Sequence, residues 1–162
     1  MSPLDDIRYW IWLSAVNGVG GVKAERLLKH FGDARSIYFA REEQLRCVSG
    51  LSGKNIAALM NKGMKAADMA LETCRKRGFG VICLTDDNYP TRLREIPGPP
   101  PVLYYTGDIA ALEGAVTVGV VGSRKASADG QISARRLSYE IACCGGSVIT
   151  GMAEGIDTMA AK

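Results

Sequence analysis

The residues best suited to chemistry lie in the stretch VTVGVVGSRKASADG, residues 116–130. A valine-rich run stops at Gly122 and is followed by Ser123, Arg124 and Lys125. A break between a buried strand and a helix leaves backbone N–H groups pointing outward at the turn, and the N-terminus of the helix adds partial positive charge. Two adjacent cations reinforce that charge. The pattern therefore predicts a site for an anion, with a phosphate group as the expected ligand.

A second loop, GMAEGID, follows the next expected strand and runs from Gly151 through Gly155 to Asp157. In open parallel sheets, ligands bind outside the carboxyl ends of the strands, where both loops are expected to lie. We expect Ser127 to cap the helix after the first loop and Asp157 to cap a helix that begins near Thr158.

The first loop does not match the GxGxxG fingerprint of dinucleotide-binding proteins, because Gly119 lies inside the strand and Gly122 ends it. The planar guanidinium of Arg124 can hold two oxygens of a phosphodiester or phosphoryl group. The alternative is a structural turn in which Arg124 forms a surface ion pair. The two cations together with the helix dipole favour the anion site.

No catalytic group accompanies these loops in the sequence. The single histidine, His30, lies in the other half of the chain and is expected to be a helix-end or surface residue. Asp86 and Asp87 are expected to form a turn before Tyr89 and Pro90. The sequence thus predicts binding without catalysis, with no metal site and no cofactor.

The two halves of the chain differ in character. Residues 1–78 carry apolar side chains at helical spacing and are expected to form a helical domain. Residues 79–162 are expected to form the first part of an α/β domain, in which residues 116–121, 127–144 and 147–150 make a right-handed strand–helix–strand unit with parallel strands. Shorter strands are expected at residues 81–84 and 102–105, and between them lies the segment PGPPP, residues 97–101, with four prolines. The expected helix would bury Gly130, Ala134, Leu137, Ile141 and Cys144.

A weak repeat with a constant offset of 32 residues occurs in the helical half. The segments LSAVNGVG and LRCVSGLS, centred on Gly18 and Gly50, are each followed by a second apolar helix, which is the helix–hairpin–helix pattern. In versions that bind DNA the hairpin amides hold a phosphate, and Lys23 and Lys54 could assist. We favour the simpler interpretation, in which the glycines permit tight turns between helices.

Composition bounds the remaining possibilities. The chain has 162 residues, 47% of them hydrophobic, and a formal net charge of +3, so a nucleic-acid site would be a local patch. We expect no membrane span and no signal peptide, and we expect a cytoplasmic protein. The five cysteines include no CxxC pair, and we expect them to be reduced. Four of them, Cys74, Cys83, Cys143 and Cys144, are expected to be small buried residues.

Three segments together resemble the DprA/Smf family of DNA-processing proteins. They are DNYP with the following PPPVLYYTG, then VVGSRKAS, and finally TGMAEGID. The helical half resembles the sterile-alpha-motif-like or helix–hairpin–helix domain of that family, and the second half resembles part of its extended Rossmann fold. The resemblance implies a recombination mediator that binds single-stranded DNA and loads the RecA recombinase during natural transformation. It also implies that the DNA pocket is lined by Gly122, Ser123, Arg124, Lys125 and Ser127, with Gly151 and Gly155 as its other wall.

The sequence departs from the family pattern at two positions. Asp129 replaces the usual tyrosine, and Ala161 replaces a usual histidine. The chain also ends at Lys162 in the middle of the expected fold, which indicates a fragment. Its open sheet edge would have to be covered, for example by self-association, and the longer family members are expected to be homodimers.

Two other functions stay open at this point. A Gly-Ser-Arg loop also occurs in the LOG family of phosphoribohydrolases, so a nucleotide-binding enzyme is the main alternative. Such an enzyme needs a PGGxGT segment, which this sequence lacks. The third possibility is an interaction module with a vestigial pocket, which Asp129 and Ala161 favour.

Overall fold

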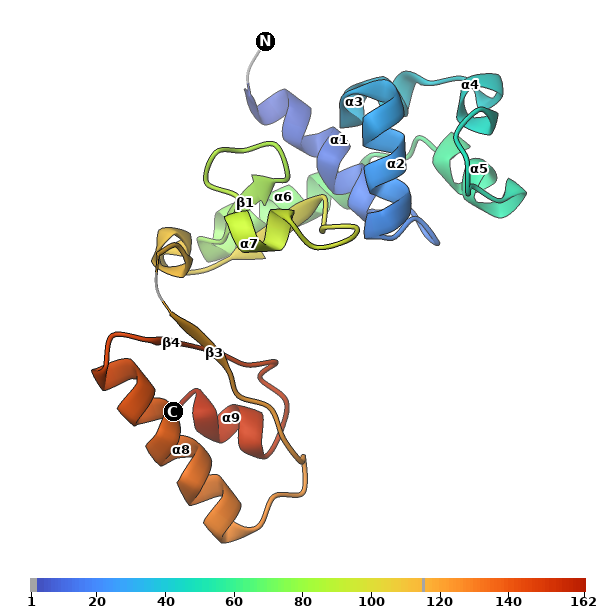
Figure 1. Ribbon diagram of the computed structural model, residues 1–162. Coiled ribbons are helices and arrows are strands. Elements are labelled where there is room, and N and C mark those ends of the chain that lie inside the picture. Colours follow the sequence, from blue (N-terminus) through green and yellow to red (C-terminus); the bar gives the residue numbers. More distant parts are fainter. Residues whose placement is uncertain (1–2, 115) are drawn as a thin grey trace. The chain divides into compact units, whose positions relative to one another are not determined.

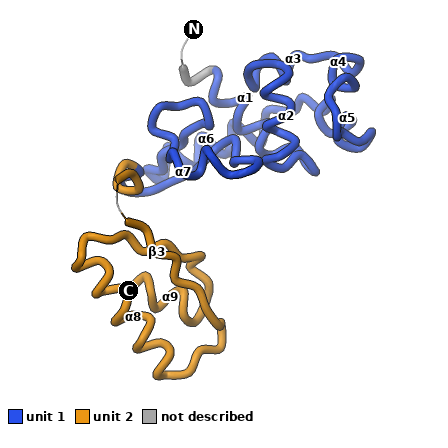
Figure 2. The backbone as a smooth tube through the Cα atoms, viewed as in Figure 1, with its two compact units in different colours: residues 1–109 blue, residues 110–162 orange. Residues whose placement is uncertain are grey.

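The computed structural model describes residues 3–114 and 116–162 and shows a mixed α/β chain (Figure 1). The chain divides into two compact units, Met1–Ile109 and Ala110–Lys162 (Figure 2). The first unit contains the elements α1 (Pro3–Ala15), α2 (Gly21–Phe31), α3 (Ala34–Phe39), α4 (Glu42–Arg46), α5 (Gly53–Met60), α6 (Lys65–Arg77), β1 (Gly80–Cys83), α7 (Thr91–Arg94) and β2 (Val102–Tyr105). A short 3₁₀ turn, η1 (Ile109–Leu112), spans the division, and the second unit continues with β3 (Thr117–Gly119), α8 (Ala128–Cys143), β4 (Ser147–Ile149) and α9 (Ile156–Ala160).

The core of the first unit is built around α1. Four consecutive residues of this helix, Trp10 to Leu13, are buried, so α1 is covered on several sides by α2, α3, α6 and β2. The backbone of residues 61–62 is fastened to this core, because Trp12 Nε1 donates a hydrogen bond to Asn61 O at 3.1 Å and Tyr38 donates one to Lys62 O at 2.7 Å. Burial lowers the pKa of Lys62 to about 8.

The 32-residue repeat corresponds to two turns of the same backbone form. Gly18 and Gly50 both have positive φ, at 76° and 83°, which only glycine adopts readily. The equivalent positions Lys23 and Asn55 meet at the first turn. Lys23 Nζ and Asn55 Nδ2 donate to Gly18 O at 2.8 and 2.9 Å, and Lys23 Nζ also donates to Asn55 Oδ1 at 3.0 Å. These bonds join the two repeats.

Strands β1 and β2 pair antiparallel, with Gly80 opposite Tyr105 and Cys83 opposite Val102. Cys83 and Val102 are buried in the same cluster as the helices. The division between compact units consequently falls after this strand pair, whereas the composition changes at residues 78 and 79. The domain boundary expected there stays a prediction.

The proline-rich loop between β1 and β2 packs against the start of α2. A Cβ atom on Gly21 would lie 1.9 Å from Gly98 O, so the two backbones touch, and Gly98 N donates to Glu25 Oε2 at 3.1 Å. Gly53, the equivalent of Gly21 in the second repeat, has open space at the same position.

The second unit contains the parallel strand–helix–strand unit that the sequence predicts. Thr117, Val118 and Gly119 of β3 pair in parallel with Ser147, Val148 and Ile149 of β4, and α8 connects the two strands. The strands are shorter than expected. The expectation that the first strand is buried is wrong, because Thr117 and Val118 are only half-buried, Gly119 is exposed, and Val116 and Val121 are 74% and 77% exposed.

The expected buried face of α8 is partly wrong. Ala134 is buried and Ile141 is half-buried, but Leu137 is 57% exposed and Cys144 is also exposed. Ser138 is buried instead, because α8 packs against both β4 and α9, and the short side chains of Ala134 and Ser138 give α9 room to approach. Cys143 is exposed as well, so of the four cysteines expected in the core only Cys74 and Cys83 lie there.

None of the helices in the described part of the chain has the length and apolarity needed to cross a bilayer.

The contact between Gly21 and Gly98 predicts unequal effects of alanine at equivalent positions. Gly21→Ala places a methyl group on a backbone oxygen and should lower the free energy of unfolding by about 1–3 kcal/mol. Gly53→Ala should change it by about 1 kcal/mol or less, in the stabilising direction, because alanine favours the helix. Urea unfolding followed by tryptophan fluorescence measures both, since the two tryptophans of the chain lie in the first unit. Equal effects of the two substitutions would contradict the close contact.

Candidate nucleic-acid interface

Two loops at the carboxyl ends of β3 and β4 form the candidate site. The first loop, residues 120–127, leaves the sheet after Val120 N donates to Ile149 O at 2.9 Å. It ends at Ser127, whose Oγ accepts a hydrogen bond from Gly130 N at 3.2 Å, which confirms Ser127 as the cap of α8. The second loop, residues 150–155, leads from β4 into α9. Both loops therefore lie at the same edge of the sheet.

The two loops touch through their backbones. Ile156 N donates to Ser123 O at 3.2 Å. Gly155 has a φ of 86°, and a Cβ atom there would lie 2.2 Å from Ser123 O and 2.7 Å from Arg124 O. Gly122 also has a close neighbour in α9, because a Cβ atom on it would lie 2.6 Å from the Ile156 side chain. These two glycines thus allow the loops to pack together, whatever ligand they hold.

Asp157 contacts both loops. The expectation that it caps the next helix is wrong. Helix α9 begins at Ile156, and its N-cap, Gly155, makes no side-chain capping bond. Asp157 Oδ1 instead accepts a hydrogen bond from Gly122 N at 3.1 Å, and the residue is only 6% exposed. Its Oδ2 lies 3.1 Å from the place that a Cβ on Gly151 would occupy. The Gly122 amide, expected to point outward, is therefore already bonded.

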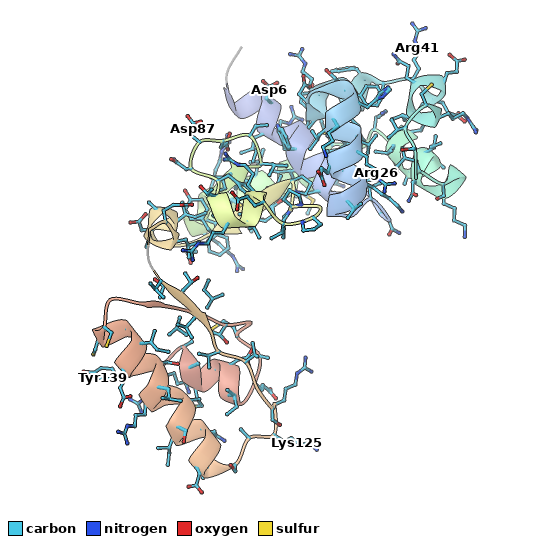
Figure 3. The ribbon with its side chains drawn as sticks, in the orientation of Figure 1. Asp6, Arg26, Arg41, Asp87, Lys125 and Tyr139 are labelled. Atoms are coloured by element: carbon cyan, nitrogen blue, oxygen red, sulfur yellow. The ribbon has the colours of Figure 1, made fainter. Side chains whose placement is uncertain are left out.

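Arg124 and Lys125 are both exposed. Figure 3 shows Lys125 on the loop that leads into α8. Across residues 3–114 and 116–162, neither cation has a carboxylate or other acceptor as a partner. Lys125 N donates to Ser123 Oγ at 3.1 Å, which fixes the turn that presents both side chains. The interpretation of Arg124 as half of a surface ion pair is thus wrong within the described chain.

The α8 helix supplies the second electrostatic contribution. Its 16 residues align enough peptide dipoles to give the N-terminus partial positive charge. Two exposed carboxylates reduce it, Asp129 in the first turn of α8 and Glu154 in the second loop. The positive charges at the two loops are therefore two full cations and a helix N-terminus, and the negative charges are these two acids and the buried Asp157.

Lys23 and Lys54 lie in the first unit and differ in availability. The Lys23 ammonium is held by Gly18 O and Asn55 Oδ1, within the contact between the repeats. Lys54 is exposed in the first turn of α5 and has no partner in the described part of the chain. Only the second of the two lysines is therefore free to meet a ligand. The first hairpin is in addition approached by the Gly98 backbone.

Asp157 is the residue whose role sequence reasoning missed. A signal for it existed, because Asp157 and Ala160 are three positions apart and so lie on one face of a helix, the face that α9 buries.

Comparison with known proteins agrees with this architecture. The family profile of DNA recombination-mediator protein A matches residues 80–162. Protein Smf of Synechocystis is 34% identical over 153 residues, which are 92% of this chain and 38% of that protein. DNA processing protein DprA of Bacillus subtilis is 35% identical over 89 residues, which are 55% of this chain and 30% of that protein. The X-ray structure of DNA processing protein A from Streptococcus pneumoniae superposes with a TM-score of 0.67 at 25% identity, covering 94% of this chain and 52% of that one.

The fold and the loop pair define an α/β protein with a helical first part and a Rossmann-like parallel unit. The chain belongs to the DNA recombination-mediator protein A family, which includes the DprA and Smf proteins. It spans about half or less of the length of these relatives.

The close approach of the loops predicts that Gly155 cannot be replaced. Gly155→Ala adds a clash with two backbone oxygens to the cost of a positive φ, and should destabilise the second unit by roughly 2–5 kcal/mol. Gly145→Ala is the matched control, because Gly145 also has a positive φ, of 78°, but has nothing within 4 Å. It should cost only about 1–2 kcal/mol. Hydrogen exchange of residues 116–162, measured by mass spectrometry, compares the two, and equal losses of protection would show that the loops do not pack as described.

Proposed function

We propose that this chain binds single-stranded DNA through the first loop, with Arg124 and Lys125 gripping phosphates and the N-terminus of α8 adding its dipole. The observation that carries the proposal is the presence, just before a 16-residue helix, of two adjacent cations that have no partner among the residues that the structure describes. A site that follows a nucleic-acid backbone needs cations and amide donors and no nucleophile. Membership of the DNA recombination-mediator protein A family supports a DNA ligand.

In this proposal the seven predicted residues have different roles. Arg124 and Lys125 contact phosphate directly. Ser123 and Ser127 hold the loop and the helix start through the Lys125 and Gly130 amides. The three glycines, Gly122, Gly151 and Gly155, let the loops and Asp157 approach one another. Lys54 is a secondary contact in the first unit, and Lys23 contributes through the structure of the hairpin.

Membership of the family supports a wider role. We infer that the protein acts without catalysis as a recombination mediator in the cytoplasm, delivering the RecA recombinase to single-stranded DNA during natural transformation. Homodimer formation is part of the same proposal and concerns the longer relatives. To test this role, purified RecA is mixed with single-stranded DNA coated by single-strand-binding protein, with and without this protein. A mediator shortens the lag before RecA hydrolyses ATP, so the lag should be shorter when the protein is present.

The direct test of the site is DNA binding by loop variants. Arg124→Ala and Lys125→Ala should each weaken binding of a fluorescent oligothymidylate by about 1–3 kcal/mol, as measured by anisotropy. Each should also reduce the slope of log K against log salt concentration by about 0.7, the value for one phosphate contact on a single strand.

Arg135→Ala is the control for these variants. Arg135 is an exposed arginine of α8 without a partner in the described residues, so its loss removes the same charge from outside the loop. It should leave the affinity within about two-fold, in keeping with the modest effect of a remote exposed charge. If Arg124→Ala and Arg135→Ala behave alike, the first loop is not the binding site.

A further inference from the structure

Asp157 is a buried acid that contacts the first loop, which is the loop expected to bind an anion. The residue is 6% exposed, and its Oδ1 is 3.1 Å from Gly122 N, one residue before Ser123. Thr150 Oγ1 donates to the backbone oxygen of Asp157 at 3.4 Å, which holds the residue against the end of β4. The carboxylate therefore occupies a fixed position between the two loops.

No Lys or Arg side chain neutralises this carboxylate within the part of the chain that the structure describes. Its described hydrogen-bond donor is an amide, which carries only partial charge. Because the group is removed from water, its field on neighbouring groups is screened less than that of a surface acid. An anion on the first loop is thus attracted by Arg124 and Lys125 and repelled by the buried Asp157, in addition to the exposed acids Asp129 and Glu154.

The repulsion depends on the charge of the phosphate. A phosphodiester inside a nucleic-acid strand carries one negative charge, whereas a terminal phosphate monoester carries close to two at neutral pH. A loop built for a doubly charged phosphate surrounds it with free amides. Here the Gly122 amide is already used by Asp157, which removes one donor.

We propose that Asp157 is a specificity-determining residue that makes the first loop select internal phosphodiesters and discriminate against terminal phosphates and free nucleotides. The inference rests on the proposed function, since it concerns the same loop. It names the ligand more narrowly, as the interior of a DNA strand and not the phosphorylated end of that strand.

A pair of small ligands that differ in one charge tests this on the unaltered chain. Thymidine 5′-phosphate and its methyl ester carry the same base and sugar, but the ester is a monoanionic diester. Each is used to displace a fluorescent oligothymidylate without terminal phosphates at pH 7.5. The ester should displace at a concentration at least three-fold lower. Two loop cations acting without Asp157 would give the opposite order, and that order would overturn the inference.

Asp157→Asn then tests the residue itself. Asparagine retains an acceptor oxygen for Gly122 N and removes the charge, so the loop keeps its shape, which a thermal melt followed by circular dichroism checks. The preference for the ester should fall at least three-fold or reverse. Glu43→Gln is the control, because Glu43 is an exposed acid of α4 whose side chain has no partner among the described residues, and it should leave the preference unchanged.

The outcomes separate the two proposals. Normal oligothymidylate binding with no preference for the ester, or an equal shift in both variants, overturns the role of Asp157 and leaves the DNA site intact. Failure of the chain to bind the oligothymidylate overturns both. Should Asp157→Asn not fold, the two exposed acids decide the inference: Asp129→Asn and Glu154→Gln should each leave the preference for the ester in place, and its loss in either variant overturns the role of Asp157.

Discussion

The backbone contact between the two loops is the constraint on which the candidate site depends. Parallel strands end at one edge of a sheet, but their loops meet only if side chains do not keep them apart. Gly155 meets the oxygens of Ser123 and Arg124, and Gly122 meets Ile156. The loop that carries Arg124 and Lys125 is therefore packed against the second loop. A loop fixed in this way loses little conformational freedom when it binds a ligand.

Close backbone contacts at glycines also determine how the two hairpins of the first unit are used. Its two hairpins share a sequence pattern and a positive-φ glycine, but their surroundings differ. Gly98 covers the start of α2, and Lys23 is used to join the repeats through Gly18 O. The start of α5 stays open, with Lys54 exposed. The first motif has thus become a contact that stabilises the unit, whereas at the second motif Gly50 lies against the Arg26 guanidinium and Lys54 stays exposed.

The positive charge that is available to bind a polyanion is concentrated at one place in this protein. A formal net charge of +3 gives only weak attraction to a polyanion, and several exposed cations are neutralised by acids one helical turn away, as in the pairs Lys29–Glu25, Arg46–Glu42 and Arg136–Glu140. Such exposed pairs contribute little to stability. Arg124 and Lys125 differ because their neighbours in the loop are small and because neither forms an ion pair within the described residues. The proposed affinity for DNA therefore depends on a few cations in one place.

The sequence by itself determined the local structure. Apolar periodicity predicted the strand–helix–strand unit, Ser127 predicted the start of α8, and the glycines of the repeat predicted the two turns, because each of these depends on residues close together in the chain. The tertiary structure decided which groups are buried and paired. Leu137 is exposed and Ser138 buried because α9 packs on α8, and Lys23 is engaged because Asn55, 32 residues away, folds against it. Asp157 bonds Gly122 across 35 residues in place of capping its own helix. Periodicity restricts which face of a helix can be buried, but only the neighbouring elements select that face and supply the partners of its polar groups.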